Sequence, residues 1–335
     1  VNDSSIRIKS SLRCPEEIYV GESATSYRIV LGLLGSSGCI THVSGEPGLA
    51  KRPMEPLIKA LEANDVRLTL NGDGFYDVDG SASQFVSSMI FYYAKKGGGE
   101  FLVKNMRSPG YVYITKRALY DLGYFVNVER TITINPSGVW KTTIDVEPDY
   151  SSMAFFLVLG LLSEEVDMRF NIKRMSRIQP DSILLDIFRD NLAIDRDTVR
   201  VLPGIKNRIT IDADHNPDLA PPLAVIGIFS DAGVEIDNYA RLKTKESDRY
   251  EAMIDLASRF GAIVEDNGKD LFIKKGDLKN PSTLAYEDHR MIMSAAIAAA
   301  VSGFEIDIEN ESRVSKSFPG FFKELSKFAR IEESN

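Results

Sequence analysis

Short segments in which apolar and polar residues alternate recur along the chain, and between them lie segments with the apolar spacing of a helix. Alternation with a period of two is typical of a strand with one buried face, whereas apolar residues three and four positions apart are typical of an amphipathic helix. The alternating segments predict strands at residues 5–10, 17–21, 65–70, 125–130, 132–136, 167–172, 208–214, 233–239, 270–275 and 304–309. The helical spacing predicts helices at residues 24–35, 54–63, 83–95, 113–122, 150–162, 182–191, 219–230, 246–260, 289–302 and 319–328.

The order of these elements favours one class of fold. The predicted strands are amphipathic, whereas an all-parallel sheet covered on both faces would show continuous apolar runs. Sheets with one polar face and helices packed on the other face fit the pattern better. The succession strand–helix–strand–helix–strand–strand repeats at a spacing of roughly 65–75 residues, which indicates an internal duplication. We therefore predict an α/β protein of the α+β type, with a boundary near residues 142–152, where a strand passes into a new helix.

Composition narrows the class of protein. The chain has 335 residues, of which 44% are hydrophobic and 26% are charged, as expected for a globular protein long enough for two domains. Its net charge of −8 argues against nucleic acid as a partner, so any anion site has to be a local cluster of Lys and Arg. No apolar run reaches the length of a membrane span, so no membrane partner is predicted.

Cysteine and histidine give no sign of a metal site. The cysteines, Cys14 and Cys39, and the three histidines show neither a CxxC nor an HExxH spacing. Both cysteines are expected to stay reduced in a cytoplasmic protein. We therefore predict that the chain binds no metal.

The segment RLKTKESDR, residues 241–249, places positive charge at the start of a predicted helix. Lys245 and Arg249 are four residues apart, which on a helix puts two like charges on one face, and the helix dipole disfavours cations in the first turn. Arg290 follows the capping residue Asp288 in a similar way. A strong anion such as phosphate or carboxylate would balance these charges, because helix N termini with free N–H groups bind anions.

This functional interpretation competes with a simpler one. An Arg in a first helical turn is usually solvated or paired with a carboxylate, and residues such as Asp149 and Asp288 usually only cap helices. Two more cations lie in compact motifs, Arg52 in SGEPGLAKRPMEPL and Lys316 in VSKSFPGFF. Their joint occurrence in an acidic protein without a P-loop motif favours a site for anionic substrates.

Taken in order, the motifs of the chain resemble those of the EPSP synthase family, the 3-phosphoshikimate 1-carboxyvinyltransferases. GESATSYR resembles the family's GNxGTxxR, GEPGLAKRPM its GxxxLxxRPM, DGSASQF its GxxSSQ, and SPGYVYIT its SxPYIxxT. VEPDYSSMAFF and NPDLAPPLAV resemble xxGDxSSAxFF and xPDxxPxLAV. RLKTKESDR, EDHRMIMSAA and VSKSFPGFF follow the family most closely and are its most specific motifs.

The resemblance implies a fold and a reaction. The family has two globular domains built from βαβαββ units around a pseudo-threefold axis, with sheets outside and helices inside, which close on the substrates. Here the first domain would span residues 1–147, without its first unit, and the second would span residues 148–335. The 5-hydroxyl of shikimate 3-phosphate would attack C2 of phosphoenolpyruvate while C3 is protonated, and the tetrahedral intermediate would then lose phosphate. Neither a metal nor an organic cofactor is implied, and a cytoplasmic monomer is expected.

The resemblance also implies roles for individual residues. Phosphoenolpyruvate would be bound by Ala24, Arg52, Gln84, Arg249, Arg290 and Lys316. Shikimate 3-phosphate would be bound by Ala82, Ser83, Gln84, Ser108, Tyr111, Asp218, Arg241 and Lys245. Asp218 is the candidate base, Glu246 is the candidate proton carrier at C3, and Lys245 is the third candidate catalytic residue.

Several positions depart from the family pattern. Glu22 and Ala24 stand where the family usually has Asn and Gly, Ala82 replaces the first Ser of SSQ, and Arg241 replaces an Asn common in some members. Nothing ahead of GESATSYR supplies the family's early KSxxxR motif, so roughly a fifth of a full-length member is expected to precede Val1. Two alternatives stay open: an enolpyruvyl transferase with another acceptor, and a non-catalytic remnant that binds anions.

Overall fold

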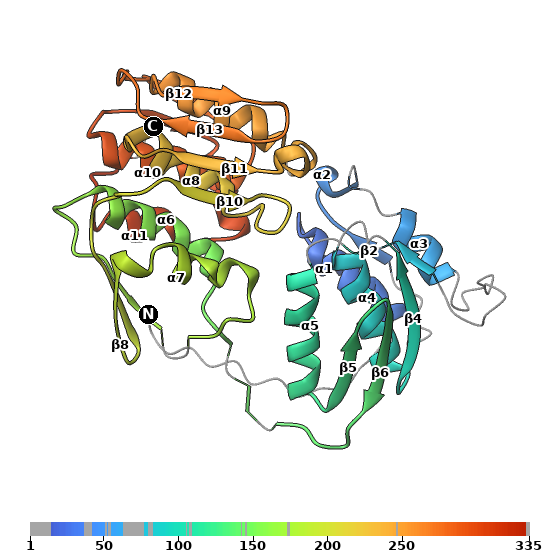
Figure 1. Ribbon diagram of the computed structural model, residues 1–335. Coiled ribbons are helices and arrows are strands. Elements are labelled where there is room, and N and C mark those ends of the chain that lie inside the picture. The colour runs from blue at the N-terminus through green and yellow to red at the C-terminus, as the bar shows by residue number, and fades with distance from the viewer. Residues whose placement is uncertain are drawn as a thin grey trace. The chain divides into compact units, whose positions relative to one another are not determined.

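The computed structural model of the chain (Figure 1) describes most of its length. The described residues are 15–36, 42–50, 52, 55–62, 77–79, 83–104, 106, 109–141, 143–144, 146–172, 175–245 and 247–332. The strands predicted at 5–10 and 65–70 lie outside these ranges, as do Cys14 and Cys39.

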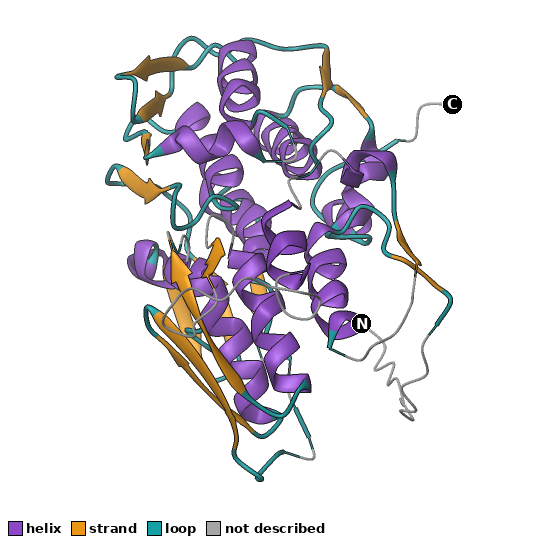
Figure 2. Ribbon diagram, turned by 90° about the vertical axis from the view of Figure 1, so that its right-hand side faces the viewer, coloured by secondary structure: helices purple, strands orange, loops and turns teal. Residues whose placement is uncertain are grey.

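One complete repeat of the predicted kind lies in the first half of the chain. It runs in order through β3 (Asp77–Asp79), α4 (Ser83–Lys95), β4 (Gly99–Lys104), α5 (Pro109–Asp121), β5 (Tyr124–Val128) and β6 (Thr131–Pro136). The strands form a four-stranded sheet in the order β3-β4-β6-β5, in which β3 and β4 are parallel and the other neighbours are antiparallel. Phe101, Val103, Ile132 and Ile134 alternate along β4 and β6 and are buried, as the period of two predicts. The strands lie along one side of the helices (Figure 2).

A second complete repeat has the same connectivity. It runs through β10 (Ile209–Asp212), α8 (Ala220–Phe229), β11 (Val234–Asp237), α9 (Arg249–Arg259), β12 (Ile263–Asp266) and β13 (Leu271–Lys274). Its four-stranded sheet has the order β10-β11-β13-β12, again with the first pair parallel and the others antiparallel. The predicted fold class, with βαβαββ units repeated along the chain, is therefore confirmed.

The other described elements form smaller sheets and short helices. β1 (Glu17–Tyr19) pairs in parallel with β2 (His42–Ser44) around α1 (Ala24–Gly35), and β14 (Thr283–Ala285) pairs in parallel with β15 (Asp307–Glu309) around α10 (His289–Ser302). After α6 (Tyr150–Leu162), three strands form an antiparallel sheet in the order β7-β9-β8: β7 (Arg169–Asn171), β8 (Leu192–Asp195) and β9 (Thr198–Val201). The short helices are α2 (Pro47–Ala50), α3 (Glu55–Glu62), α7 (Leu184–Ile187), α11 (Phe321–Leu325) and the 3-10 turns η1 (Pro180–Ile183), η2 (Arg189–Asn191), η3 (Tyr239–Thr244) and η4 (Glu311–Lys316).

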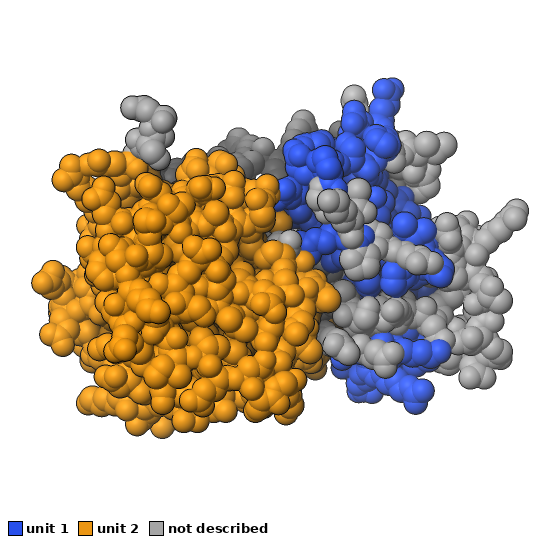
Figure 3. All heavy atoms as spheres, turned by 90° about the horizontal axis from the view of Figure 1, so that it is seen from above, with its two compact units in different colours: residues 1–106, 115–142 blue, residues 107–114, 143–335 orange. Residues whose placement is uncertain are grey.

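The chain divides into two compact units, which are coloured separately in Figure 3. Unit 1 comprises residues 1–106 and 115–142, and unit 2 comprises residues 107–114 and 143–335. In unit 1, α1 packs closely on α4 at Gly32, where an added Cβ would lie 2.4 Å from the carbonyl oxygen of Ser88. The domains expected at residues 1–147 and 148–335 stay a prediction.

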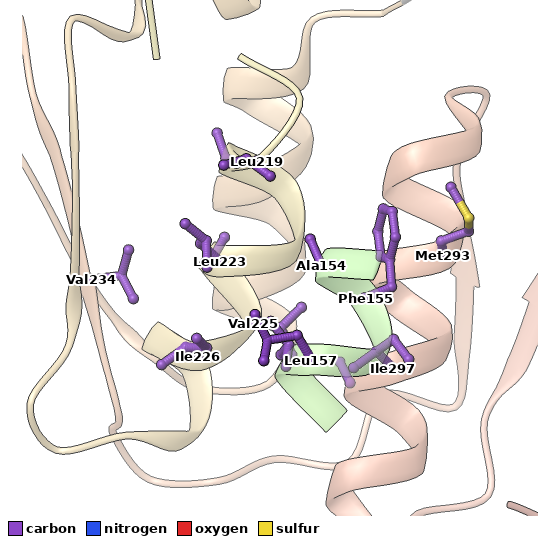
Figure 4. Close-up of a cluster of buried hydrophobic side chains, with 14 of the residues drawn as sticks. Ala154, Phe155, Leu157, Leu219, Leu223, Val225, Ile226, Val234, Met293 and Ile297 are labelled. Carbon is purple, nitrogen blue, oxygen red and sulfur yellow. The ribbon is translucent and has the colours of Figure 1, made fainter. Parts of the chain in front are cut away.

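Three helices, α6, α8 and α10, form the centre of unit 2. Almost every side chain of α6 and α8 is buried, which is what a helix with apolar residues all round requires. Leu157 of α6, Val225 of α8 and Ile297 of α10 lie together between these helices (Figure 4). This apolar core fixes the N-terminal ends of α8 and α10, which carry the polar residues described below.

Four predicted helices differ from the structure. The helix predicted at 113–122 begins earlier, at Pro109. The helix predicted at 182–191 is broken into η1, α7 and η2, and the helix predicted at 319–328 covers only Phe321–Leu325. The helix predicted at 246–260 begins at Arg249, because Asp248 caps it by accepting a hydrogen bond from the backbone N–H of Glu251 at 3.1 Å. Lys245 lies before this cap in an extended conformation, with φ −84° and ψ −152°. The expectation that Lys245 and Arg249 share one helix face is therefore wrong.

Candidate active site

Asp218 is the centre of a group of charged side chains in unit 2. It lies two residues before the first turn of α8, and its side chain is 23% exposed. Its carboxylate accepts a hydrogen bond from Arg249 Nη1 at 2.7 Å and one from Arg290 Nη2 at 3.1 Å. The Nζ atom of Lys245 lies 3.9 Å from the same carboxylate. Three cations from two separate segments of the chain, residues 245–249 and Arg290, therefore surround one carboxylate.

Arg249 is the most deeply buried of these cations. It is 1% exposed, and it donates from Nε to Asp288 at 2.7 Å as well as from Nη1 to Asp218. Asp288 is itself 1% exposed and also caps α10 by accepting from the backbone N–H of Arg290 at 2.8 Å. The positive charge at the first residue of α9 is thus balanced by two carboxylates of the protein. Arg249 is therefore an ion-pair partner, as the simpler interpretation predicted.

Arg290 links this group to the start of α6. Its Nη2 atom donates to Ser151 Oγ at 3.2 Å as well as to Asp218. The Ser151 hydroxyl in turn donates to Asp149 at 2.8 Å, and Asp149 caps α6 by accepting from the backbone N–H of Ser151 at 3.0 Å. The N-terminal ends of α6, α8, α9 and α10 therefore meet at one place. We call the side chains of Asp218, Lys245, Arg249, Asp288 and Arg290 the Asp218 cluster.

The electrostatics of the Asp218 cluster keep its central carboxylate charged. Burial by itself would raise the pKa of Asp218, but the positive charges of Arg290, Lys245 and Arg249 hold that pKa well below its usual range. The five side chains of the cluster comprise three cations and two carboxylates, so positive charge exceeds negative charge. A partly exposed carboxylate beside surplus cations can accept a hydrogen bond from a hydroxyl while an anion binds next to it.

A second carboxylate, Asp181, lies close to the cluster and was not predicted. It belongs to η1 and is 4% exposed. It accepts a hydrogen bond from Asn216 Nδ2 at 3.0 Å, and the Tyr111 hydroxyl lies 3.4 Å from both of its oxygens. Burial, followed by the negative charge of Asp218, raises the pKa of Asp181 to about 6.

A cavity of about 340 Å³ opens beside this second carboxylate. Asn216, Asp212 and His215 line it together with Gly110, Pro180 and apolar side chains from η1, α7 and β10. His215 Nδ1 lies 3.0 Å from Asp212. The cavity shares Asn216 with the surroundings of Asp181, so it adjoins the site without containing the Asp218 cluster.

Four of the remaining predicted residues lie in helices or 3-10 turns. Tyr111 lies in the first turn of α5, and Arg241 lies in η3 and donates from Nη1 to the backbone carbonyl of Asp214 at 3.0 Å. Lys316 is the last residue of η4 and is exposed. Ala24 is the first residue of α1 and directly follows the capping residue Ser23.

The other predicted residues are described less fully. Arg52 is partly buried, and its backbone N–H donates to Leu49. Ser83 and Gln84 begin α4, and only their backbone is described. Ala82, Ser108 and Glu246 lie outside the described residues.

Sequence reasoning missed three residues that the structure brings to the site: Asp181, Ser151 and Asn216. Ser151 and Asn216 lie inside the quoted motifs VEPDYSSMAFF and NPDLAPPLAV, so their positions next to Asp149 and Asp218 were the available signal. Asp181 lies in IQPDS, a segment that carries no motif. Asp288 was predicted only as a helix cap, whereas it also balances the charge of Arg249.

Comparison with known proteins identifies the family. The family model for EPSP synthase (3-phosphoshikimate 1-carboxyvinyltransferase) matches residues 2–325. The chain belongs to the EPSP synthase family. The 3-phosphoshikimate 1-carboxyvinyltransferase of Thermoplasma acidophilum is 80% identical and is aligned over 100% of this chain and 85% of its own length. The enzyme of the same name from Thermoplasma volcanium is 63% identical, over 99% of this chain and 84% of its own length. Since these relatives carry the family's name at such identity, the predicted membership is confirmed.

Solved structures of two other proteins share the fold. The EPSP synthase of Acinetobacter baumannii superimposes with a TM-score of 0.69 at 22% identity, covering 94% of this chain and 79% of that one. An enolpyruvyl transferase from Streptomyces tendae gives a TM-score of 0.59 at 17% identity, covering 83% of this chain and 72% of that one. Over the residues that the structure describes, no helix is long and apolar enough to cross a membrane, and no group of metal-ligating side chains is found.

Proposed function

We propose that the Asp218 cluster is the place where this chain carries out the reaction of the EPSP synthase family. In that reaction the enolpyruvyl group of phosphoenolpyruvate is transferred to the 5-hydroxyl of shikimate 3-phosphate, and phosphate is released. The observation that carries the proposal is the convergence of Lys245, Arg249 and Arg290 on Asp218. Two anionic substrates can lie side by side only where positive charge is concentrated, and here it is concentrated in an acidic protein.

The proposed phosphoenolpyruvate site is built from guanidinium groups. Arg249 and Arg290 each use part of their hydrogen-bonding capacity on Asp218, and each guanidinium offers five N–H donors in a planar fork. The N–H donors of Arg290 other than those on Nη2, which contacts Ser151 and Asp218, can bind carboxylate or phosphate oxygens of phosphoenolpyruvate. Because Arg249 is fixed between two carboxylates, it is preorganised, whereas Arg290 is 10% exposed at its side chain and stands closer to solvent.

Asp218 is proposed to orient the attacking hydroxyl. A carboxylate whose pKa lies well below its usual range is ionised at neutral pH and accepts hydrogen bonds. It can therefore hold the 5-hydroxyl of shikimate 3-phosphate by its proton, with the oxygen directed at C2 of phosphoenolpyruvate. The same low pKa makes Asp218 a weak base in the empty site, so the proton moves fully only as the new C–O bond forms.

The other predicted ligands are carried into the proposal from the family motifs. In unit 2, Lys316 would bind phosphoenolpyruvate, and Ser108, Tyr111 and Arg241 would bind shikimate 3-phosphate. In unit 1, Ala24, Arg52, Ala82, Ser83 and Gln84 occupy the corresponding family positions. Glu246 would deliver the proton to C3, because it adjoins Lys245 in the motif KESDR. We further propose a cytoplasmic monomer that uses neither metal nor organic cofactor and has no nucleic-acid or membrane partner.

The test is an assay of phosphate release with both substrates present, with mass spectrometry of the product. We expect Arg290→Lys to lower turnover by at least 100-fold, because an ammonium group lacks the planar fork of further N–H donors that Arg290 has beyond the Nη2 atom bound to Ser151 and Asp218. Arg259→Lys is the matched control: Arg259 also pairs with an aspartate, Asp255, but at the exposed C-terminal end of α9. Equal turnover in the wild type and the Arg290→Lys variant would refute the assignment of the site.

The same assay decides the acceptor. Shikimate 3-phosphate is the acceptor favoured by the motifs SPGY and KESDR and by the name of the close relatives. If phosphate were released only with another hydroxyl compound, the chain would be an enolpyruvyl transferase with a different acceptor. If phosphoenolpyruvate bound without any turnover, the chain would be an anion-binding remnant.

A further inference from the structure

Asp181 is a buried carboxylate for which the described residues provide no ion-pair partner. It is 4% exposed, and its side-chain hydrogen-bond partners among the described residues are the neutral side chains of Asn216 and Tyr111. A buried carboxylate usually has a cation or several N–H donors around it, because an isolated negative charge is expensive to remove from water. The proposed mechanism gives Asp181 no role, although one of its partners, Tyr111, is a proposed ligand of shikimate 3-phosphate.

Besides Asp212 and His215, which line the adjoining cavity, four elements contribute charged or titratable groups around Asp181. These groups are Tyr111 at the start of α5, Asp149 at the cap of α6, Asp218 before α8, and Arg290 in α10. The adjoining α7 contributes Asp186, which pairs with Arg177 at the exposed surface. Two carboxylates and one arginine thus act on Asp181 across the site, and negative charge prevails. Consequently burial and the charge of Asp218 together raise the pKa of Asp181 to about 6.

The state of Asp181 decides what Tyr111 can do. Burial and the charge of Asp181 raise the pKa of Tyr111 well above its usual range, so the phenol keeps its single proton. While Asp181 is ionised, that proton points to the carboxylate, and the phenol can offer only lone pairs to a ligand. Once Asp181 is protonated, its own O–H can donate to the phenol oxygen, which leaves the phenol proton free for an anionic ligand.

We propose that Asp181 is a positioning residue that takes up one proton from solvent when shikimate 3-phosphate binds, and that it acts on the substrate through Tyr111. The proton adds to a carboxylate oxygen of Asp181, and the phenol O–H of Tyr111 turns from that oxygen to the substrate. An incoming anion favours this uptake, because negative charge nearby stabilises the neutral form of a carboxyl group. Release of the substrate or product returns the proton to solvent. This inference rests on the proposed contact between Tyr111 and shikimate 3-phosphate.

The experiment measures the proton directly. Calorimetric titration of the chain with shikimate 3-phosphate at pH 7, in two buffers of different ionisation enthalpy, gives the number of protons taken up on binding. We expect wild-type uptake to exceed that of the Asp181→Asn variant by roughly half a proton, since a carboxyl with a pKa near 6 is mostly ionised at pH 7 and becomes largely protonated beside an anion. The phosphate group of the ligand also titrates, but it does so equally in both proteins, so the difference isolates Asp181.

Two more variants separate this role from a structural one. Asp212→Asn removes another carboxylate of unit 2, whose pKa is lowered and which therefore stays ionised at neutral pH. The Asp212→Asn variant should consequently take up as many protons on binding as the wild type. Tyr111→Phe keeps Asp181 but removes the phenol, so both uptake and affinity for shikimate 3-phosphate should fall. In steady-state assays, KM for shikimate 3-phosphate should depend less on pH between pH 5 and 8 in the Asp181→Asn variant than in the wild type, with kcat nearly unchanged; the remaining dependence is that of the ligand's phosphate group.

The possible outcomes are distinct. Equal proton uptake by the wild type and the Asp181→Asn variant overturns the inference. A second outcome is that Asp181→Asn loses the proton uptake while Tyr111→Phe keeps full uptake and full affinity. This result would show that Asp181 titrates without acting through Tyr111. It would overturn the proposed action on the substrate and remove Tyr111 from the proposed binding site. Weak binding by the wild type that Arg290→Lys does not change would instead count against the proposed site itself.

Discussion

The Asp218 cluster is proposed to orient the attacking hydroxyl and to bind an anionic substrate. Asp218→Asn should separate these two tasks, because it should lower turnover and at the same time strengthen the binding of an anion. The carboxylate now neutralises part of the charge of Lys245, Arg249 and Arg290. An isosteric amide keeps the shape of the side chain and one acceptor oxygen, but it removes the negative charge. The three cations then have to find another counter-charge, and a ligand can supply it.

The size of the effect follows from the geometry. Arg249 and Arg290 donate to Asp218 at 2.7 and 3.1 Å, so an anion bound on the other side of the same guanidinium groups would lie about 6 Å from that carboxylate. At that separation and an effective dielectric constant of about 20, two unit charges repel by about 3 kcal/mol. Removing the carboxylate should therefore raise the affinity for phosphate or phosphoenolpyruvate by roughly 10- to 100-fold, less at high ionic strength. Turnover should fall by about 10²- to 10⁴-fold, since the attacking hydroxyl loses its acceptor.

Calorimetric titration with inorganic phosphate and with phosphoenolpyruvate measures the affinity. Thermal unfolding with increasing phosphate gives a second readout, because a ligand that binds only the folded state raises the melting temperature. Asp167→Asn is the matched control: Asp167 also bridges two arginines, Arg169 and Arg200, but at the exposed surface. Unchanged or weaker phosphate binding by the Asp218→Asn variant would refute the reasoning, since it would mean that the anion does not bind against these cations.

Three further predictions follow from single side chains. Arg249→Ala should lower the free energy of unfolding by about 3–5 kcal/mol, because it removes the arginine that pairs with the buried carboxylate of Asp288, and it should also weaken phosphoenolpyruvate binding. A denaturant titration that finds a loss below about 1 kcal/mol would contradict this. Because the pKa of Asp181 is raised, the folded state binds the proton more tightly than the unfolded state. The free energy of unfolding of the wild type should therefore decline by on the order of 3 kcal/mol as the pH rises from about 4 through 6. Urea titrations of the Asp181→Asn variant should lack that decline. Ala24 replaces a glycine that in the family lines the phosphoenolpyruvate pocket, so Ala24→Gly should increase inhibition by the slightly longer inhibitor glyphosate; inhibition curves that coincide would show that the methyl group is not responsible.

The repeated fold was accessible from the sequence where its strands and helices carry strong periodicity, whereas β3, β4 and β12 of the two complete repeats were not predicted. The alternation in β6 and β13 and the long apolar runs of α6 and α10 match the structure closely. The hairpin of β8 and β9 was missed for a definite reason. Its two-residue turn places Arg196 at φ +47°, a left-handed conformation for which Gly or Asn is the usual signal, and each strand has only four residues.

The candidate site was accessible only in part. The motifs named Asp218, Lys245, Arg249 and Arg290, but they could not show that two carboxylates of the protein already neutralise part of that positive charge. Arg249 and Asp288 are 39 residues apart, and the packing of α9 beside α10 brings them together. Helix boundaries are weakly encoded as well. Because Asp248 caps α9, this helix begins at Arg249, three residues after the predicted start at 246, and Lys245 lies outside it.

The arrangement of the Asp218 cluster couples the two halves of the proposed reaction. In the empty site, Asp218 keeps three cations from repelling one another. When the 5-hydroxyl attacks C2 of phosphoenolpyruvate, its proton passes to Asp218 and the carboxylate loses its charge. The positive charge of Arg249, Arg290 and Lys245 is then available to the phosphate group, which gains negative charge as its bond to C2 breaks. A more basic carboxylate, without these cations, would take the proton more readily, but its protonation would release no positive charge for the departing phosphate. The low pKa of Asp218 is therefore consistent with its proposed role, because the cations that make it a weak base are the ones that stabilise the leaving group.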